Sequence, residues 1–93
     1  MSRRHPFEQL KDRANSNLIG FLRTELDLGF TLADTAKIEA GMQNREHYER
    51  ARKFAEAAVE TVHRFESRIV EPKIRRELQE RADQLTKLLS LMR

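Results

Sequence analysis

Glu60 and His63 are the residues of this chain whose types and spacing best suit chemistry. Di-metal carboxylate bundles use this Glu-x-x-His spacing on one helix, together with further glutamates on facing helices. The chain contains one such motif, so a metal site would need two copies of the chain, with Glu25 as an additional ligand. A surface ion pair between Glu60 and Arg64, four residues later, accounts for the glutamate without a metal. We therefore predict no metal and no cofactor, and we keep the di-metal homodimer as a remote alternative.

The residues that other kinds of catalysis require are missing from the chain. The chain has no cysteine, which excludes a disulfide framework, thiolate ligands and a cysteine nucleophile. It has no glycine-rich phosphate loop, and no serine is paired with a plausible base. With 93 residues, the chain also has little volume for an enclosed substrate pocket. We therefore predict that it is not an enzyme and has no catalytic residues.

The basic residues near the N-terminus suggest a different function, which is weak nucleic-acid binding. They are Arg3, Arg4, Lys11 and Arg13, and two acidic residues lie among them. The chain lacks a glycine-containing turn at helix-turn-helix spacing, so nucleic acid is the second choice of partner. The same N-terminus has no apolar segment of a secretory signal, and no apolar run is long enough to cross a bilayer. The expected compartment is the cytoplasm, without membrane association.

Most of the remaining charge is typical of helix surfaces. In six places an acidic residue precedes a basic residue by four positions, which is the favourable order for pairing along a helix. These pairs are Glu46/Arg50, Glu49/Lys53, Glu60/Arg64, Glu71/Arg75, Glu77/Arg81 and Asp83/Lys87.

Helix is the only regular structure with support, because three glycines and two prolines are the main interruptions and no alternating apolar pattern persists. We predict one all-α domain over residues 1–93, a three-helix bundle with a short leading helix. The Asn15–Asn17 cluster lies between the leading helix and the second helix. Asn44 caps the start of the third helix, and Pro72 begins the last one. The predicted helices cover residues 6–14, 17–40, 45–69 and 72–91, and residues 1–5 are expected to be disordered.

Two residues on the apolar face of the predicted helix 17–40 break its pattern. Gly29 either ends a helix, with Thr31–Asp34 as a capping box for the next, or lies within one continuous helix. We favour continuity, because an interior glycine costs only about 1 kcal/mol and lets a neighbouring helix approach closely. Glu25 lies where an apolar residue is expected, and a buried carboxylate needs a partner. We predict a buried ion pair with Arg52, and the alternative is a ligand or metal contact.

Small residues in the motif Ala51-x3-Ala55-x2-Ala58 are similar to the second helix of a tetratricopeptide hairpin. The order of helices also resembles the three-helix microtubule-interacting-and-transport domain. Residues 24–28 and 61–65 look like segments of small bacterial helical proteins without known activity. The resemblance implies a tetratricopeptide-like helical hairpin with a third helix, and it implies no functional residue.

An excess of apolar residues on the helix 17–40 is the strongest functional indication. Phe21, Leu28 and Phe30 lie outside its main apolar face, and exposed apolar patches mark association sites. We therefore expect a non-catalytic protein-protein interaction module or a small homo-oligomer, with these three residues as the candidate partner interface.

Overall fold

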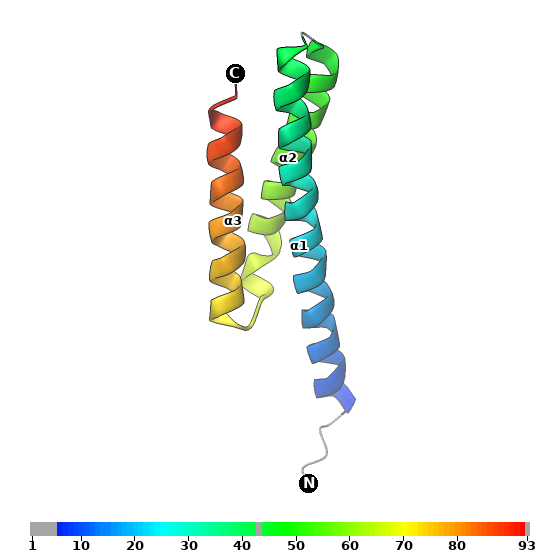
Figure 1. The fold of residues 1–93 in the computed structure, drawn as a ribbon. Helices are drawn as coiled ribbons and strands as arrows, with labels where there is room; N and C mark the ends of the chain where they lie inside the picture. Colours follow the sequence, from blue (N-terminus) through cyan, green and yellow to red (C-terminus); the bar gives the residue numbers. More distant parts are fainter. Residues whose placement is uncertain (1–5, 43, 93) are drawn as a thin grey trace.

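The structure is a computed structural model that describes residues 6–42 and 44–92. It contains the helices α1 (Pro6–Gly41), α2 (Arg45–Phe65) and α3 (Pro72–Ser90), with a 3-10 turn, η1 (Glu66–Arg68), between the last two. No strand occurs among the described residues, so the predicted all-α class is confirmed. Helices α1 and α2 form an antiparallel hairpin, and α3 packs against both (Figure 1).

α1 is one helix of 36 residues, whereas the sequence predicted two helices over 6–14 and 17–40. The Asn15–Asn17 cluster lies inside it. Asparagine or serine within a helix costs at most about 0.7 kcal/mol relative to alanine. A second helix would need a new nucleus, which is unfavourable. The existing helix therefore continues through the cluster, and the predicted leading helix is its first part.

The continuity of α1 through Gly29 agrees with the favoured prediction. Thr31 does not cap a new helix. Its hydroxyl donates to the carbonyl oxygen of Asp27, four residues earlier, at 3.0 Å, which is a bond made within a helix. Gly29 is buried, and a Cβ added there would lie 2.7 Å from Leu85 Cδ2 and 3.0 Å from Ala58 Cβ. The glycine thus lets α2 and α3 approach α1 closely, as predicted.

The starts of α2 and α3 follow local signals. The Asn44 side chain accepts a hydrogen bond from the backbone N–H of His47 at 3.4 Å, and Pro72 lies in the first turn of α3. α2 ends at Phe65, one turn before the predicted end at residue 69. Ile69 is extended and fully buried, so the chain turns there to place it in the core before Pro72.

The core lies between the packed parts of the three helices. Its largest fully buried side chains come from every helix and from the turn after α2, and they are Leu22, Leu26, Val62, Ile69, Leu78 and Leu85. No helix in the described ranges is both long and apolar enough to span a membrane. Residues 1–5, which the sequence predicts to be disordered, lie outside the described ranges.

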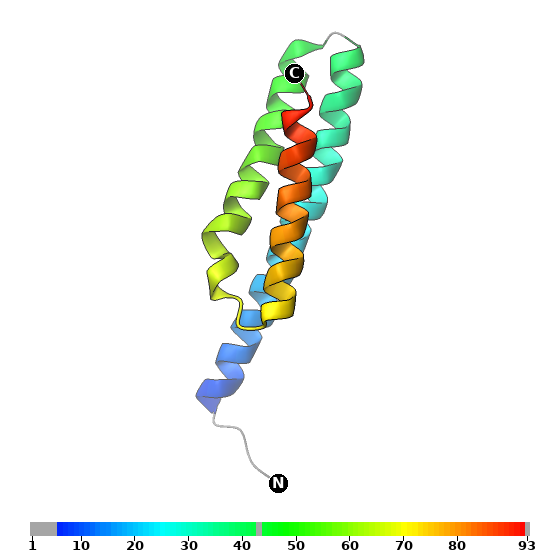
Figure 2. The same ribbon diagram turned by 90° about the vertical axis from the view of Figure 1, so that its left-hand side faces the viewer.

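The first part of α1 extends past the end of the bundle. We call residues 6–17 the arm. Its residues are exposed except for a half-buried Asn15, and the first buried residue of α1 is Ile19. Figures 1 and 2 show the arm continuing beyond the turn that joins α2 to α3. The molecule is accordingly a rod, with extents of 62 × 19 × 18 Å.

Candidate interaction surface

Apolar side chains form a line along the outer face of α1. Phe7, Leu10, Phe21 and Leu28 are 59%, 61%, 47% and 51% exposed. Phe7, Ala14, Phe21 and Leu28 are spaced seven residues apart, and Leu10 follows Phe7 by three. This spacing keeps the five residues on one face, as in the contact line of a coiled coil. We call Phe7, Leu10, Ala14, Phe21 and Leu28 the α1 seam.

Charged residues flank the seam, and their sign changes along its length. In the arm, Lys11 and Arg13 lie on its two sides, and the Lys11 ammonium lies 5.1 Å from the centroid of the Phe7 ring. In the packed part of α1, Glu25 and Asp27 lie on the same two sides. The seam therefore has a basic end and an acidic end.

The three predicted interface residues do not lie together. Phe21 and Leu28 belong to the seam, but Phe30 is half-buried against the core. Two residues of α-helix rotate the side chain by about 200°, so Phe30 points away from Leu28. It faces α3, where the guanidinium of Arg81 lies 5.7 Å from its ring centroid. Phe30 therefore does not share a surface with Phe21 and Leu28.

Phe7 and Leu10 were missed as interface candidates, because the sequence placed them in a separate leading helix. The seven-residue spacing of Phe7, Ala14, Phe21 and Leu28 is visible in the sequence. That spacing would have joined them to the later residues once α1 was treated as continuous.

The predicted buried pair of Glu25 and Arg52 is wrong. Glu25 is half-buried rather than buried, and it makes no ion pair with any described residue. The antiparallel register places Gly29 beside Ala55 and Ala58. Glu25 therefore faces a part of α2 beyond Ala58, whereas Arg52 lies on the other side of Ala55.

Arg52 instead holds the C-terminal end of α3 against α2. It bonds the Glu56 carboxylate at 3.0 Å and donates to the Met92 carbonyl oxygen. Tyr48 donates its hydroxyl hydrogen to the same carbonyl at 2.9 Å. The hydrogen bond with Tyr48, helped by Glu56, holds the pKa of Arg52 above its ordinary value. The guanidinium thus has a structural role.

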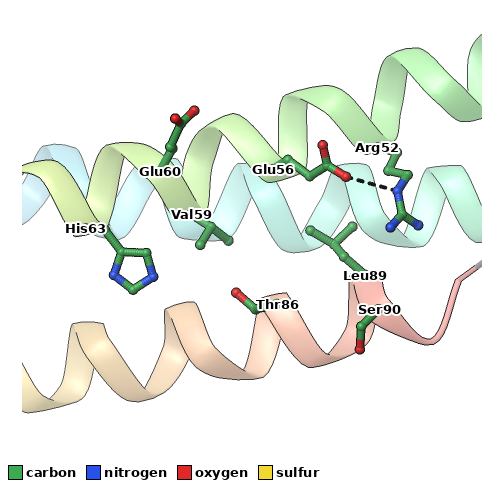
Figure 3. A pocket seen from close by; sticks show the side chains of 8 residues that line it. All are labelled: Arg52, Glu56, Val59, Glu60, His63, Thr86, Leu89 and Ser90. Carbon is green, nitrogen blue, oxygen red and sulfur yellow. Dashed lines mark hydrogen bonds and ion pairs between the residues drawn. The ribbon is translucent and has the colours of Figure 1, made fainter.

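Glu60 and His63 border a shallow groove between α2 and α3. Figure 3 shows His63 turned toward α3 and Glu60 pointing away from it, so the two do not converge. His63 Nδ1 lies 3.5 Å from Glu66 Oε2. On the α3 side, Thr86 and Ser90 donate their hydroxyls to the backbone of their own helix. No three histidine, aspartate or glutamate residues gather for a metal within residues 6–42 and 44–92.

One of the ion pairs expected along the helices, Glu77/Arg81, is replaced by two ion pairs between helices. Of the six predicted pairs, Glu46–Arg50 forms at 3.3 Å, and the other five are absent from the described part of the chain. Glu77 pairs with Arg23 of α1 at 2.9 Å, and Arg81 pairs with Asp27 of α1 at 2.5 Å. These two pairs join α1 to α3 on the side away from the groove.

Comparisons of the chain with protein-family models, with curated proteins and with solved structures found no match. Of the resemblance noted in the sequence, the arrangement of three packed helices is what the structure supports. The surface itself must therefore indicate the function.

Proposed function

We propose that this chain is a non-catalytic interaction module that binds a protein partner, either itself or another protein, through the α1 seam. The exposure of Phe7, Leu10, Phe21 and Leu28 along one line of a single helix supports this most directly. Large exposed apolar residues scattered singly need no explanation, but an aligned set on a helix is typical of helix-to-helix association.

The groove between α2 and α3 is a weaker candidate for a small-molecule site than the seam is for a protein-binding surface. Arg52, Thr86 and Ser90 border it, and each makes a hydrogen bond within the chain. A small-molecule site needs several polar groups that converge on one point and remain free to bind. The seam instead presents four large apolar side chains that are between 47% and 61% exposed.

The exposed area sets the strength of the expected association. Burying the exposed halves of the four large seam residues contributes about 1 kcal/mol each. Association in turn costs at least about 4 kcal/mol in lost translational and rotational freedom. One seam alone is therefore marginal, and a partner must supply an apolar face of its own. We expect a weak or transient complex rather than an obligate one.

Substitution of the seam tests this function. We expect the double variant Phe21→Ser/Leu28→Ser to lose association, measured as concentration-dependent mass and as retention of proteins by the immobilised chain. The matched control is Val70→Ser/Leu91→Ser, since these residues are also strongly exposed but lie off α1. Circular dichroism should show that both variants remain folded. Equal association by the wild type and the seam variant would contradict the proposal.

A further inference from the structure

We propose that the partner of the α1 seam is a second copy of this chain, bound antiparallel, so that each arm lies along the packed part of the other copy's α1. This rests on the proposed function, because it names the occupant of the same surface. Charge complementarity carries it, since the seam is basic at one end and acidic at the other.

The antiparallel arrangement brings opposite charges together in a single register. With Leu10 of one copy facing Leu28 of the other, Ala14 faces Thr24, and Phe21 faces Asn17. In that register Lys11 flanks Glu25 of the other copy, and Arg13 flanks its Asp27. Coiled coils select orientation and register through such flanking charges. Two-fold symmetry repeats each of these contacts.

Other arrangements lose these contacts. Sliding one helix by seven residues in either direction leaves Lys11 facing Leu18 or Leu32, both apolar. A parallel dimer keeps Lys11 and Arg13 of one copy away from Glu25 and Asp27 of the other, so these opposite charges do not meet. The antiparallel register therefore pairs both charged flanks at once and sets Leu10 against Leu28.

Two observations on the single chain fit this arrangement. Glu25 makes no ion pair within the described ranges, and the Asp27 side chain remains 71% exposed although it bonds Arg81. Both carboxylates can thus accept a further cation. Gly20 is exposed and has nothing within 4 Å of an added Cβ, so the fold of the single chain does not require a glycine at this position. In the proposed dimer the two Gly20 residues face each other at the centre, where missing side chains let the helices approach.

The positions of the two bundles along the paired helices follow from the register. The facing positions are centred between Leu18 and Gly20, close to Ile19, where burial of α1 begins. The α2–α3 body of each copy therefore lies toward the opposite end of the paired helices. Each arm extends beyond its own bundle (Figure 2). In the proposed dimer it runs along α1 of the other copy.

A charge exchange tests the pairing. We expect Lys11→Glu and Glu25→Lys, each alone, to raise the dimer dissociation constant about tenfold, because each converts two attractive contacts to repulsive ones. The double variant Lys11→Glu/Glu25→Lys should return to within about threefold of the wild type, since both contacts become attractive again. Residues 11 and 25 are about 21 Å apart along α1, so this rescue cannot occur within one chain. Absence of rescue would overturn the proposal.

Disulfide trapping reports the orientation directly, because the chain has no cysteine of its own. An oxidised mixture of Ala14→Cys and Thr24→Cys chains should give the mixed disulfide, and Ala14→Cys alone should not cross-link. Cross-linking of Ala14→Cys alone would indicate a parallel dimer and overturn the proposal. A wild type that remains monomeric would also overturn it. If that monomer still binds another protein through Phe21 and Leu28, the proposed function stands and only the identity of the partner is wrong.

Discussion

The arm and the packed part of α1 differ in everything except their backbone. From Ile19 onward, the helix buries Leu22, Leu26 and Ala33 against α2 and α3. In residues 6–17 the same helix has few neighbours. Lys11, Ala14 and Asn15 border a hollow with Arg68 and Val70, and Phe7 and Leu10 are exposed. Packing of one part supplies the nucleus from which the other part extends. A helix can therefore be continuous across a boundary at which its environment changes completely.

The residues that stabilise the fold are therefore different from those that the fold exposes to a partner. The buried apolar residues of the packed part are explained by the core of the single chain. Phe7 and Leu10 of the arm are not, because they remain 59% and 61% exposed. The seam joins the two parts, since Phe7 and Leu10 lie in the arm and Phe21 and Leu28 lie on the outer face of the packed part.

The largest expected effect contrasts one leucine from each part. Leu26→Ala, at a fully buried position, should lower the free energy of unfolding by about 3 kcal/mol, because it removes buried methyl groups and leaves a cavity. Leu10→Ala should change it by less than about 0.5 kcal/mol in the monomer. Urea unfolding at low protein concentration measures both. Leu26→Met, with a loss below about 1.5 kcal/mol, is the control if the alanine variant is poorly folded. Similar losses for Leu26→Ala and Leu10→Ala would mean that the arm is packed in solution.

Local signals explain which features could be predicted from the sequence. The cap at Asn44, the start of α3 at Pro72 and the close approach at Gly29 depend on a few neighbouring residues or on one apolar face. The burial of Ala51, Ala55 and Ala58 in α2 follows from their helical spacing in the sequence. These parts of the bundle were therefore accessible from the chain alone.

The errors about the candidate site concern relations between segments. The pair of Glu25 and Arg52 failed because the register of α1 against α2 is set by packing at Gly29, which the sequence does not specify. The orientation of Phe30 depends on where α3 lies. The break expected near Asn15 failed because the helix is nucleated by contacts far from that residue. The full seam depends on a continuous α1, so the predicted interface contained Phe21 and Leu28 but not Phe7 or Leu10.

Two glycines of α1 give a smaller contrast. Gly29→Ala places a Cβ 2.7 Å from Leu85 Cδ2 and 3.0 Å from Ala58 Cβ, so it should destabilise the chain by about 1 kcal/mol after the gain in helix propensity. Gly20→Ala has open space around it and should stabilise the monomer by about 0.5–1 kcal/mol. Thermal unfolding of the two variants at low concentration provides the comparison. A stabilising Gly29→Ala would show that α2 and α3 move apart without cost.

The smallest expected effect concerns Asp27, which lies beside the seam and also pairs with Arg81 of α3. An ion pair with one partner this exposed contributes about 0.5 kcal/mol, and salt should weaken it. A double-mutant cycle of Asp27→Asn and Arg81→Gln isolates that coupling from the contact of Arg81 with Phe30. Asp34→Asn, a nearby α1 aspartate without an ion pair in the described residues, is the control and should leave the free energy of unfolding nearly unchanged. A coupling near zero at low salt would mean that Asp27 does not help to hold α3. Its carboxylate would then be available entirely to the seam, which sharpens the division between the residues that build the bundle and those that face a partner.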